Sequence, residues 1–208
     1  MHPDPIRVSY SAVRDIVPKL HAQPYDIILH IGLAAGRTYY TLERLAYRDR
    51  FDRIPDVDGV KFKEAEQIWH DVPIVMRPSF NCEDVWRRWR TGLSDHKLDV
   101  RPSDDPGNYL CGFIYYSSLA YLYKKGQDVE KPVMFLHVPD LPTPKDVRDG
   151  VDVAISMIRA LVESRERSKT KGQETKVPKE DKASYEGCGE EQMKMGEYPE
   201  TWAAEQQN

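Results

Sequence analysis

Cysteine is scarce in this chain of 208 residues, which contains only Cys82, Cys111 and Cys188. No two of them have the Cys-x-x-Cys spacing of a redox or zinc motif, and no histidine lies near enough to complete a metal set. An odd number of scattered cysteines is not a disulfide framework. Such usage is typical of a reducing compartment, so we expect a cytoplasmic protein without a metal site.

Other features are also missing from the sequence. The formal net charge is −4, so the sequence lacks the basic excess that favours nucleic acid or an anionic membrane. No apolar run approaches the roughly 20 residues of a membrane-spanning helix. The first residues, Met-His-Pro-Asp-Pro, do not resemble a signal peptide. We therefore expect neither a nucleic-acid nor a membrane partner.

The apolar segments that are present alternate between helical and strand-like patterns. Helical spacing covers 9–20, 82–93, 107–123 and 144–163, whereas continuous apolar runs at 25–31 and 132–138 and a short one at 98–100 predict strands. Segment 61–77 shows no clear pattern. The alternation predicts an α/β fold whose sheet is covered by helices on both faces.

The composition changes at Ser164. Residues 164–208 are rich in Lys, Glu, Gln, Gly and Ser and poor in aromatic residues, which is typical of a disordered segment. We therefore predict one α/β domain over residues 1–163, followed by a polar, disordered tail over 164–208. Cys188 lies in that tail and has no predicted structural role.

One cysteine stands at the start of an aromatic helical segment. Turn-forming residues 103–107 precede Cys111, which falls in the first turn of the predicted helix. The positive end of a helix dipole favours a thiolate over a thiol, as a cysteine nucleophile requires. The alternative is that Cys111 is an inert core residue, because free cysteine is often buried. This segment alone leaves both interpretations open.

Two further side chains suit a thiol mechanism. His137 ends the second apolar strand, and Glu43 follows the glycine-rich segment 32–36. A cysteine nucleophile needs a base, and the base needs an acidic group or an amide that orients it. Cys111, His137 and Glu43 supply those three roles, although each also has an ordinary structural explanation.

Four motifs in the same order resemble those of the pyroglutamyl peptidase I family of cysteine peptidases, family C15. The residues that carry the resemblance are Gly107-Asn-Tyr-Leu-Cys111 with Tyr115 and Tyr116, Phe135-Leu-His137-Val-Pro139, His30 to Arg37 followed by Leu42-Glu43-Arg44-x-Ala46, and Ile54-Pro-Asp56-x-x-Gly59. Together they span roughly His2 to Glu163. No single motif is specific, but their combination is.

The resemblance implies an open, mostly parallel sheet in a three-layer α/β/α sandwich. It also implies removal of an N-terminal pyroglutamate from peptides through an acyl-enzyme, without metal or cofactor. Cys111 would then be the nucleophile, His137 the general acid and base, and Glu43 the residue that orients His137. Arg37 would lie beside the site of the developing oxyanion. The oligomeric state is not determined, and a homo-oligomer stays open.

The sequence departs from this family at its start. Family members have a strand and a Gly-Phe-x-Pro-Phe loop before the region that matches His2 to Leu20, and neither is present here. We therefore expect a missing first strand, an unpaired strand edge and uncovered apolar surface. An alternative hypothesis is an inactive or truncated homologue that acts as a binding protein. Gly112, where the family often has Asn or Asp, and Arg48 also depart from the pattern.

A third hypothesis is a nucleotide-binding protein that uses the glycines between Gly32 and Gly36. This hypothesis is weak, because the segment lacks both the Gly-x-Gly-x-x-Gly spacing and the lysine of a P-loop.

Overall fold

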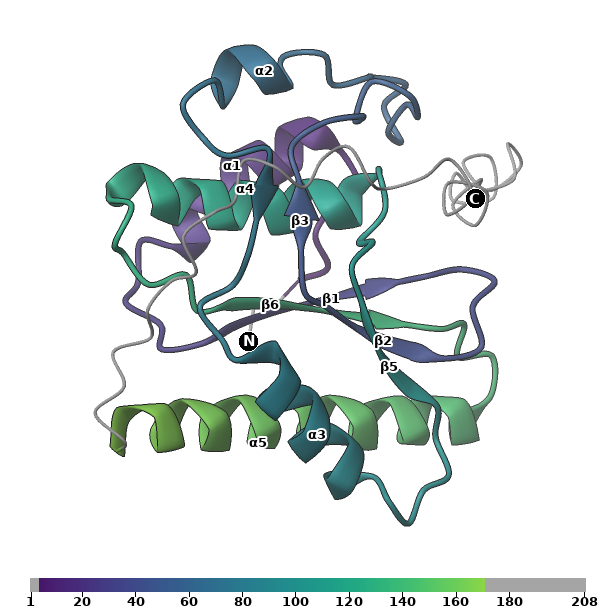
Figure 1. Ribbon diagram of the computed structural model, residues 1–208. Helices are drawn as coiled ribbons and strands as arrows, with labels where there is room; N and C mark the ends of the chain where they lie inside the picture. The colour runs from purple at the N-terminus through teal and green to yellow at the C-terminus, as the bar shows by residue number, and fades with distance from the viewer. Residues whose placement is uncertain (1–3, 171–208) are drawn as a thin grey trace.

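The chain folds into three layers around one central sheet (Figure 1). The computed structural model describes residues 4–170. Helices α1 (Tyr10–Leu20) and α4 (Leu110–Lys125) cover one face of the sheet, and α3 (Cys82–Gly92) and α5 (Pro144–Thr170) cover the other. This arrangement confirms the predicted α/β/α sandwich.

The central sheet has the order β1-β6-β2-β5. Its strands are β1 (Ile28–Leu33), β6 (Val133–Val138), β2 (Tyr40–Glu43) and β5 (Val100–Ser103). β1 is parallel to β6 and β2 is parallel to β5, while β2 and β6 are antiparallel. The sheet is therefore mostly parallel, with one antiparallel junction in its middle.

Short elements form a cap beyond α4. β3 (Ala46–Tyr47) and β4 (Val75–Met76) pair in a small antiparallel sheet, and α2 (Ala65–Ile68) is a single short helix. Figure 1 shows these elements on the same side of the central sheet as α1 and α4. α2 and β4 lie in segment 61–77, for which no element was predicted.

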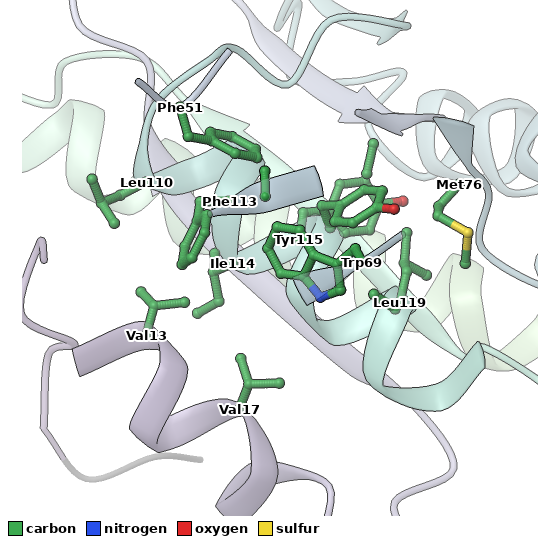
Figure 2. Close-up of a cluster of buried hydrophobic side chains, with 14 of the residues drawn as sticks. Val13, Val17, Phe51, Trp69, Met76, Leu110, Phe113, Ile114, Tyr115 and Leu119 are labelled. Atoms are coloured by element: carbon green, nitrogen blue, oxygen red, sulfur yellow. The ribbon is translucent and has the colours of Figure 1, made fainter. Parts of the chain in front are cut away.

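The core between the sheet and this cap is aromatic. Helix α4 is apolar on nearly all sides, as expected for a helix that is enclosed between two layers. Figure 2 shows Phe113 of α4 between Phe51 of the cap and Val13 of α1. The ring centroids of Phe51 and Phe113 lie 5.1 Å apart in an edge-to-face arrangement. This packing fixes the position of α4, whose first turn carries Cys111.

The core on the opposite face joins α3 and α5 to the sheet. Trp89 of α3 is fully buried and donates its indole N–H to the carbonyl oxygen of Val153 at 3.1 Å. Asn81 caps α3 by accepting from the backbone N–H of Asp84 at 3.0 Å. The amphipathic pattern that predicted this helix therefore corresponds to its buried face.

Several boundaries differ from those predicted. The first strand begins at Ile28 rather than at Tyr25 and ends at Leu33. The segment around Glu43, for which no strand was predicted, contains β2, whose four residues are all buried. Helix α5 continues to Thr170, seven positions beyond the predicted end at Glu163, so the proposed boundary between 163 and 164 falls inside a helix. Residues 171–208 and Cys188 lie outside the described residues.

Strand β1 forms one edge of the central sheet and pairs with β6 alone within residues 4–170. Its side chains Ile31 and Leu33 point to the α5 side of the sheet, but they remain exposed. No helix in the described part of the chain has the length and hydrophobicity needed to span a membrane.

Candidate active site

The candidate residues meet between the central sheet and the first turn of α4. Alternation along β2 places Glu43 on the α4 face, because Tyr40 and Leu42 enter the opposite core. Alternation along β6 places His137 on the same face as Phe135, which belongs to the aromatic core. Cys111 is the second residue of α4, so its predicted place in the first turn is confirmed.

Glu43 and His137 form a fully buried pair. Their side chains are 0% and 2% exposed, and 2.8 Å separates Oε1 of Glu43 from Nδ1 of His137. Because a carboxylate only accepts, Nδ1 carries the proton in this contact. Nε2 of His137 is buried and has no hydrogen-bond partner among the described residues. The imidazole is thus oriented with an unoccupied basic nitrogen, as a general base requires.

The backbone register explains how Glu43 reaches His137. Across the antiparallel junction, Glu43 stands opposite Phe135 and Thr41 stands opposite His137. The bond between Glu43 and His137 is therefore diagonal across two strands. The Phe135 ring packs against the imidazole with centroids 4.6 Å apart, and Tyr115 of α4 donates to the Glu43 carbonyl oxygen at 3.0 Å.

Thr41 and Arg37 complete the surroundings of the carboxylate. The Thr41 hydroxyl donates to Oε1 of Glu43 at 2.6 Å, and Arg37 donates to the Thr41 hydroxyl oxygen at 3.3 Å. The guanidinium also lies 3.6 Å from Oε1 of Glu43. Arg37 thus contacts the acidic member of the site, and its side chain is 24% exposed. Its role beside an oxyanion stays a prediction.

Gly32 of β1 brings the sulfur of Cys111 close to the sheet. A Cβ atom at Gly32 would lie 2.8 Å from the Cys111 sulfur and 2.7 Å from the Phe135 ring, so no side chain fits there. Gly32 is also the register partner of His137 between β1 and β6. The sulfur therefore lies over the backbone position directly beside His137.

The expected stabilisation of a Cys111 thiolate is wrong in direction. Cys111 is half-buried, and burial raises its pKa to about 12. The negative charge of Glu43 raises the pKa further, while Arg37 opposes both effects. Loss of hydration around the sulfur is the largest of these effects, and it favours the neutral thiol. The resting thiol keeps its proton at neutral pH and needs a base to become a nucleophile.

The first turn of α4 has no side-chain cap. Tyr109 is the N-cap residue and makes no side-chain capping bond, so the first backbone N–H groups receive no acceptor from it. The chain at Gly107, just before α4, passes close to the first turn of the helix. A Cβ atom at Gly112 would overlap the carbonyl oxygen of Gly107.

Sequence reasoning identified Cys111, His137 and Glu43, but missed Thr41 and the contact role of Gly32. A hydroxyl two positions before an acidic residue on a strand points to the same face, and that spacing was the available signal for Thr41.

The glycine-rich segment has an ordinary structural role. Gly36 adopts a positive φ of 78°, and its N–H donates to the Asp140 side chain at 2.8 Å. Within residues 4–170, no group of three or more His, Cys, Asp or Glu side chains is placed to hold a metal ion.

Comparison with known proteins gives a consistent result. The model of the pyroglutamyl peptidase family matches residues 4–163. Pyrrolidone-carboxylate peptidase of Pyrococcus furiosus is 32% identical over 117 residues, which are 56% of this chain and 53% of that protein. Human pyroglutamyl-peptidase 1 is 27% identical over 166 residues, covering 78% of this chain and 71% of the human protein.

A solved structure shares the fold. A mutant pyrrolidone carboxyl peptidase from P. furiosus matches with a TM-score of 0.59 and 24% identity, over 78% of this chain and 80% of that one. The alignment of sequences with the P. furiosus enzyme spans only about half of its length, 53%.

Proposed function

Because the chain belongs to the pyroglutamyl peptidase family, we propose that it is a cysteine peptidase that removes an N-terminal pyroglutamate from peptides. Its substrates would be peptides with that blocked N-terminus, and the reaction would need no metal or cofactor. The observation that carries the proposal is the buried Glu43–His137 pair. The Nε2 atom of His137 has no partner among the described residues, and the Cys111 sulfur approaches the same face of the sheet at Gly32, the register partner of His137.

The first chemical step joins proton transfer to nucleophilic attack. Since the pKa of Cys111 is raised to about 12, a preformed thiolate would be rare at neutral pH. His137 Nε2 takes the thiol proton while the sulfur attacks the carbonyl carbon of pyroglutamate. Glu43 accepts from Nδ1 and stabilises the resulting imidazolium. The negative charge moves to the former carbonyl oxygen.

The remaining steps return the enzyme to its starting state. The N–H groups at the start of α4 suit the developing oxyanion, and Arg37 adds positive charge nearby. The imidazolium gives its proton to the leaving amine, the carbon–nitrogen bond breaks, and an acyl-enzyme is left on Cys111. Water then attacks the thioester with His137 as the base, which releases pyroglutamate and the free thiol.

Cleavage of pyroglutamyl-aminomethylcoumarin by the full chain tests this proposal. We expect turnover by the wild type and a loss of about a thousandfold or more in Cys111→Ser, since the nucleophile is gone. Cys82→Ser is the matched control, because Cys82 is also a half-buried free cysteine but lies in α3. It should keep full activity. Turnover by Cys111→Ser at the wild-type rate would contradict the thiol mechanism.

The inactive-homologue hypothesis is supported by a different observation. The sequence alignment covers only 53% of the P. furiosus enzyme, and β1 is an edge strand with exposed Ile31 and Leu33 beside it. A folded wild-type chain without turnover, checked by circular dichroism, would favour that hypothesis over catalysis.

A further inference from the structure

The Arg37 guanidinium reaches the candidate site through a single nitrogen. Its Nη1 atom donates to the Thr41 hydroxyl oxygen at 3.3 Å and lies 3.6 Å from Oε1 of Glu43. Both distances exceed the usual hydrogen-bond length of about 2.9 Å. Ordering a long arginine side chain also costs conformational entropy, and this side chain is 24% exposed. The position of the guanidinium therefore depends on what else packs against it.

The backbone of Arg37 is fixed to the end of β6, the strand that carries His137. The Ala34 N–H donates to the Val138 carbonyl oxygen at 2.8 Å, and the Arg37 N–H donates to the Ala34 carbonyl oxygen at 3.1 Å. These bonds set the course of the connection between β1 and β2. The backbone at Arg37 is thus well determined, and the side chain is the part that can leave the site.

The ring of Tyr39, two positions after Arg37, contacts two guanidinium groups. Cζ of Arg101 lies 4.0 Å from the centroid of the ring, and Cζ of Arg37 lies 5.9 Å from it. Both distances are within the reach of a cation–π interaction, about 6 Å. The first is a close stack, and the second is near the limit. Tyr39 is half-buried, so its ring forms a wall beside Arg37.

Arg101, which stacks on this ring, is itself anchored. Its Nε donates to Oδ1 of Asp99 at 2.9 Å, and its Nη2 donates to Oδ2 at 2.5 Å. The Asp99 carbonyl oxygen also accepts from the Tyr40 N–H at 3.0 Å, which ties the same residue to the start of β2. Arg101 is the register partner of Thr41, so the two side chains share the face of the sheet that carries the candidate site.

We propose that Tyr39 is a positioning residue that holds the Arg37 guanidinium against the Glu43 carboxylate. Arg101 supports Tyr39 by fixing the plane and place of its ring. Tyr39 acts only through Arg37 and, since Arg37 belongs to the site of the proposed peptidase, this role rests on the proposed function. The two arginines and the ring between them thus extend the candidate site to the edge strand β5.

The position of Arg37 matters because its charge acts on the nucleophile. Burial and the charge of Glu43 raise the pKa of Cys111, and the charge of Arg37 opposes both. If the guanidinium turns away into solvent, that opposition is lost and the thiol gives up its proton less readily. Loss of the Tyr39 ring should therefore make Cys111 less reactive and slow the first chemical step.

The rate at which iodoacetamide modifies Cys111 in the full chain tests this role without any turnover. At pH 7.5, we expect Tyr39→Leu to slow this modification by about threefold to tenfold, because a partly buried cation–π contact is lost. Mass spectrometry follows Cys82 in the same sample, and Cys82 should react at its wild-type rate because it lies in α3. Tyr39→Phe keeps the ring and should restore the rate at Cys111. Tyr25→Leu, at an exposed tyrosine before β1, is the matched control and should have no effect.

Turnover of pyroglutamyl-aminomethylcoumarin gives a second readout. Tyr39→Leu should lower kcat by about threefold to tenfold while KM stays near the wild-type value, because Arg37 acts on the reacting groups. Arg101→Met removes the cation that holds the ring and should give a smaller loss in the same direction, whereas Arg101→Lys keeps a cation there and should restore kcat. The double variant Tyr39→Leu with Arg101→Met should match Tyr39→Leu alone, since both changes act through one ring.

The two readouts distinguish failure of this role from failure of the proposed function. A wild type without turnover, whose Cys111 is still modified more slowly in Tyr39→Leu, refutes the peptidase and supports the positioning role. Modification of Cys111 at the wild-type rate in Tyr39→Leu overturns the role, and so do equal losses in Tyr39→Leu and Tyr39→Phe. If Tyr39→Leu does not fold, the alkylation rates of Arg101→Met and Arg101→Lys decide: a slower Arg101→Met supports the role, and equal rates overturn it.

Discussion

At the residue scale, the Glu43 carboxylate is held by Thr41 as well as by His137. Oε1 of Glu43 accepts hydrogen bonds from both the His137 Nδ1–H and the Thr41 hydroxyl. Oε2 is buried and has no hydrogen-bond partner in the described chain. The Thr41 hydroxyl oxygen also accepts a hydrogen bond from Arg37, whose guanidinium lies 3.6 Å from Oε1 of Glu43. Thr41 is therefore a positioning residue for the candidate base.

Replacement of Thr41 tests this role. Thr41→Val keeps the shape of the side chain but removes the donor, so a buried carboxylate loses one of its two close bonds. We expect the free energy of unfolding to fall by about 1–3 kcal/mol. We also expect kcat to fall while KM stays near the wild-type value, because Thr41 would act through His137. Thr41→Ser keeps the hydroxyl and should restore both quantities. Equal defects in the two variants would contradict the role.

At the scale of elements, the sequence predicts what depends on periodicity and misses what depends on pairing. Helices α3 and α4 and strands β1 and β6 stand out because each is long enough to show a pattern. β2 has four residues, all buried. Its apolar side chains enter the core on one face of the sheet, and its polar side chains enter the candidate site on the other face. Its strand character arises from the neighbours β5 and β6, which local sequence does not reveal.

The same distinction applies to the candidate site. The predicted helix and strand contain Cys111 and His137, whereas the strand that carries Glu43 was not predicted. The raised pKa of Cys111 depends on packing around the sulfur from distant segments. The close passage of Gly107 over the start of α4 is likewise a tertiary feature. Such contacts have no periodic signal in the sequence.

Gly112 shows that this close passage is a constraint on α4. A side chain at position 112 would overlap the Gly107 carbonyl oxygen, which is backbone and cannot move away alone. Gly112→Asn should therefore lower the free energy of unfolding by about 1–3 kcal/mol, measured by urea denaturation. Gly59→Ala is the control, because no atom lies within 4 Å of a Cβ there and only its φ of 74° is strained. A smaller loss in Gly112→Asn than in Gly59→Ala would contradict the constraint.

At the scale of the whole molecule, stability depends on two histidines that the fold keeps neutral. His30 of β1 and His21 after α1 are buried, and burial lowers the pKa of each from 6.5 to about 4. The positive charge of Lys125 adds to the effect on His21. Nε2 of His30 lies 2.9 Å from the Ser118 hydroxyl oxygen of α4, so this neutral imidazole joins the edge strand to the central helix.

The acid limit of stability follows from these pKa values. Each histidine binds a proton near pH 6.5 in the unfolded chain but only near pH 4 in the folded chain, so its contribution is complete above pH 6.5 and disappears as the pH falls toward 4. Between pH 7.5 and pH 5, the free energy of unfolding should fall by about 2 kcal/mol for each group.

His30→Gln has no group to titrate, so its stability should fall less steeply than that of the wild type, by about half of the two-histidine contribution. His70→Gln is the control, because the His70 side chain is 73% exposed. Urea denaturation at several pH values gives the slopes. An equal slope in His30→Gln and the wild type would contradict the lowered pKa of His30.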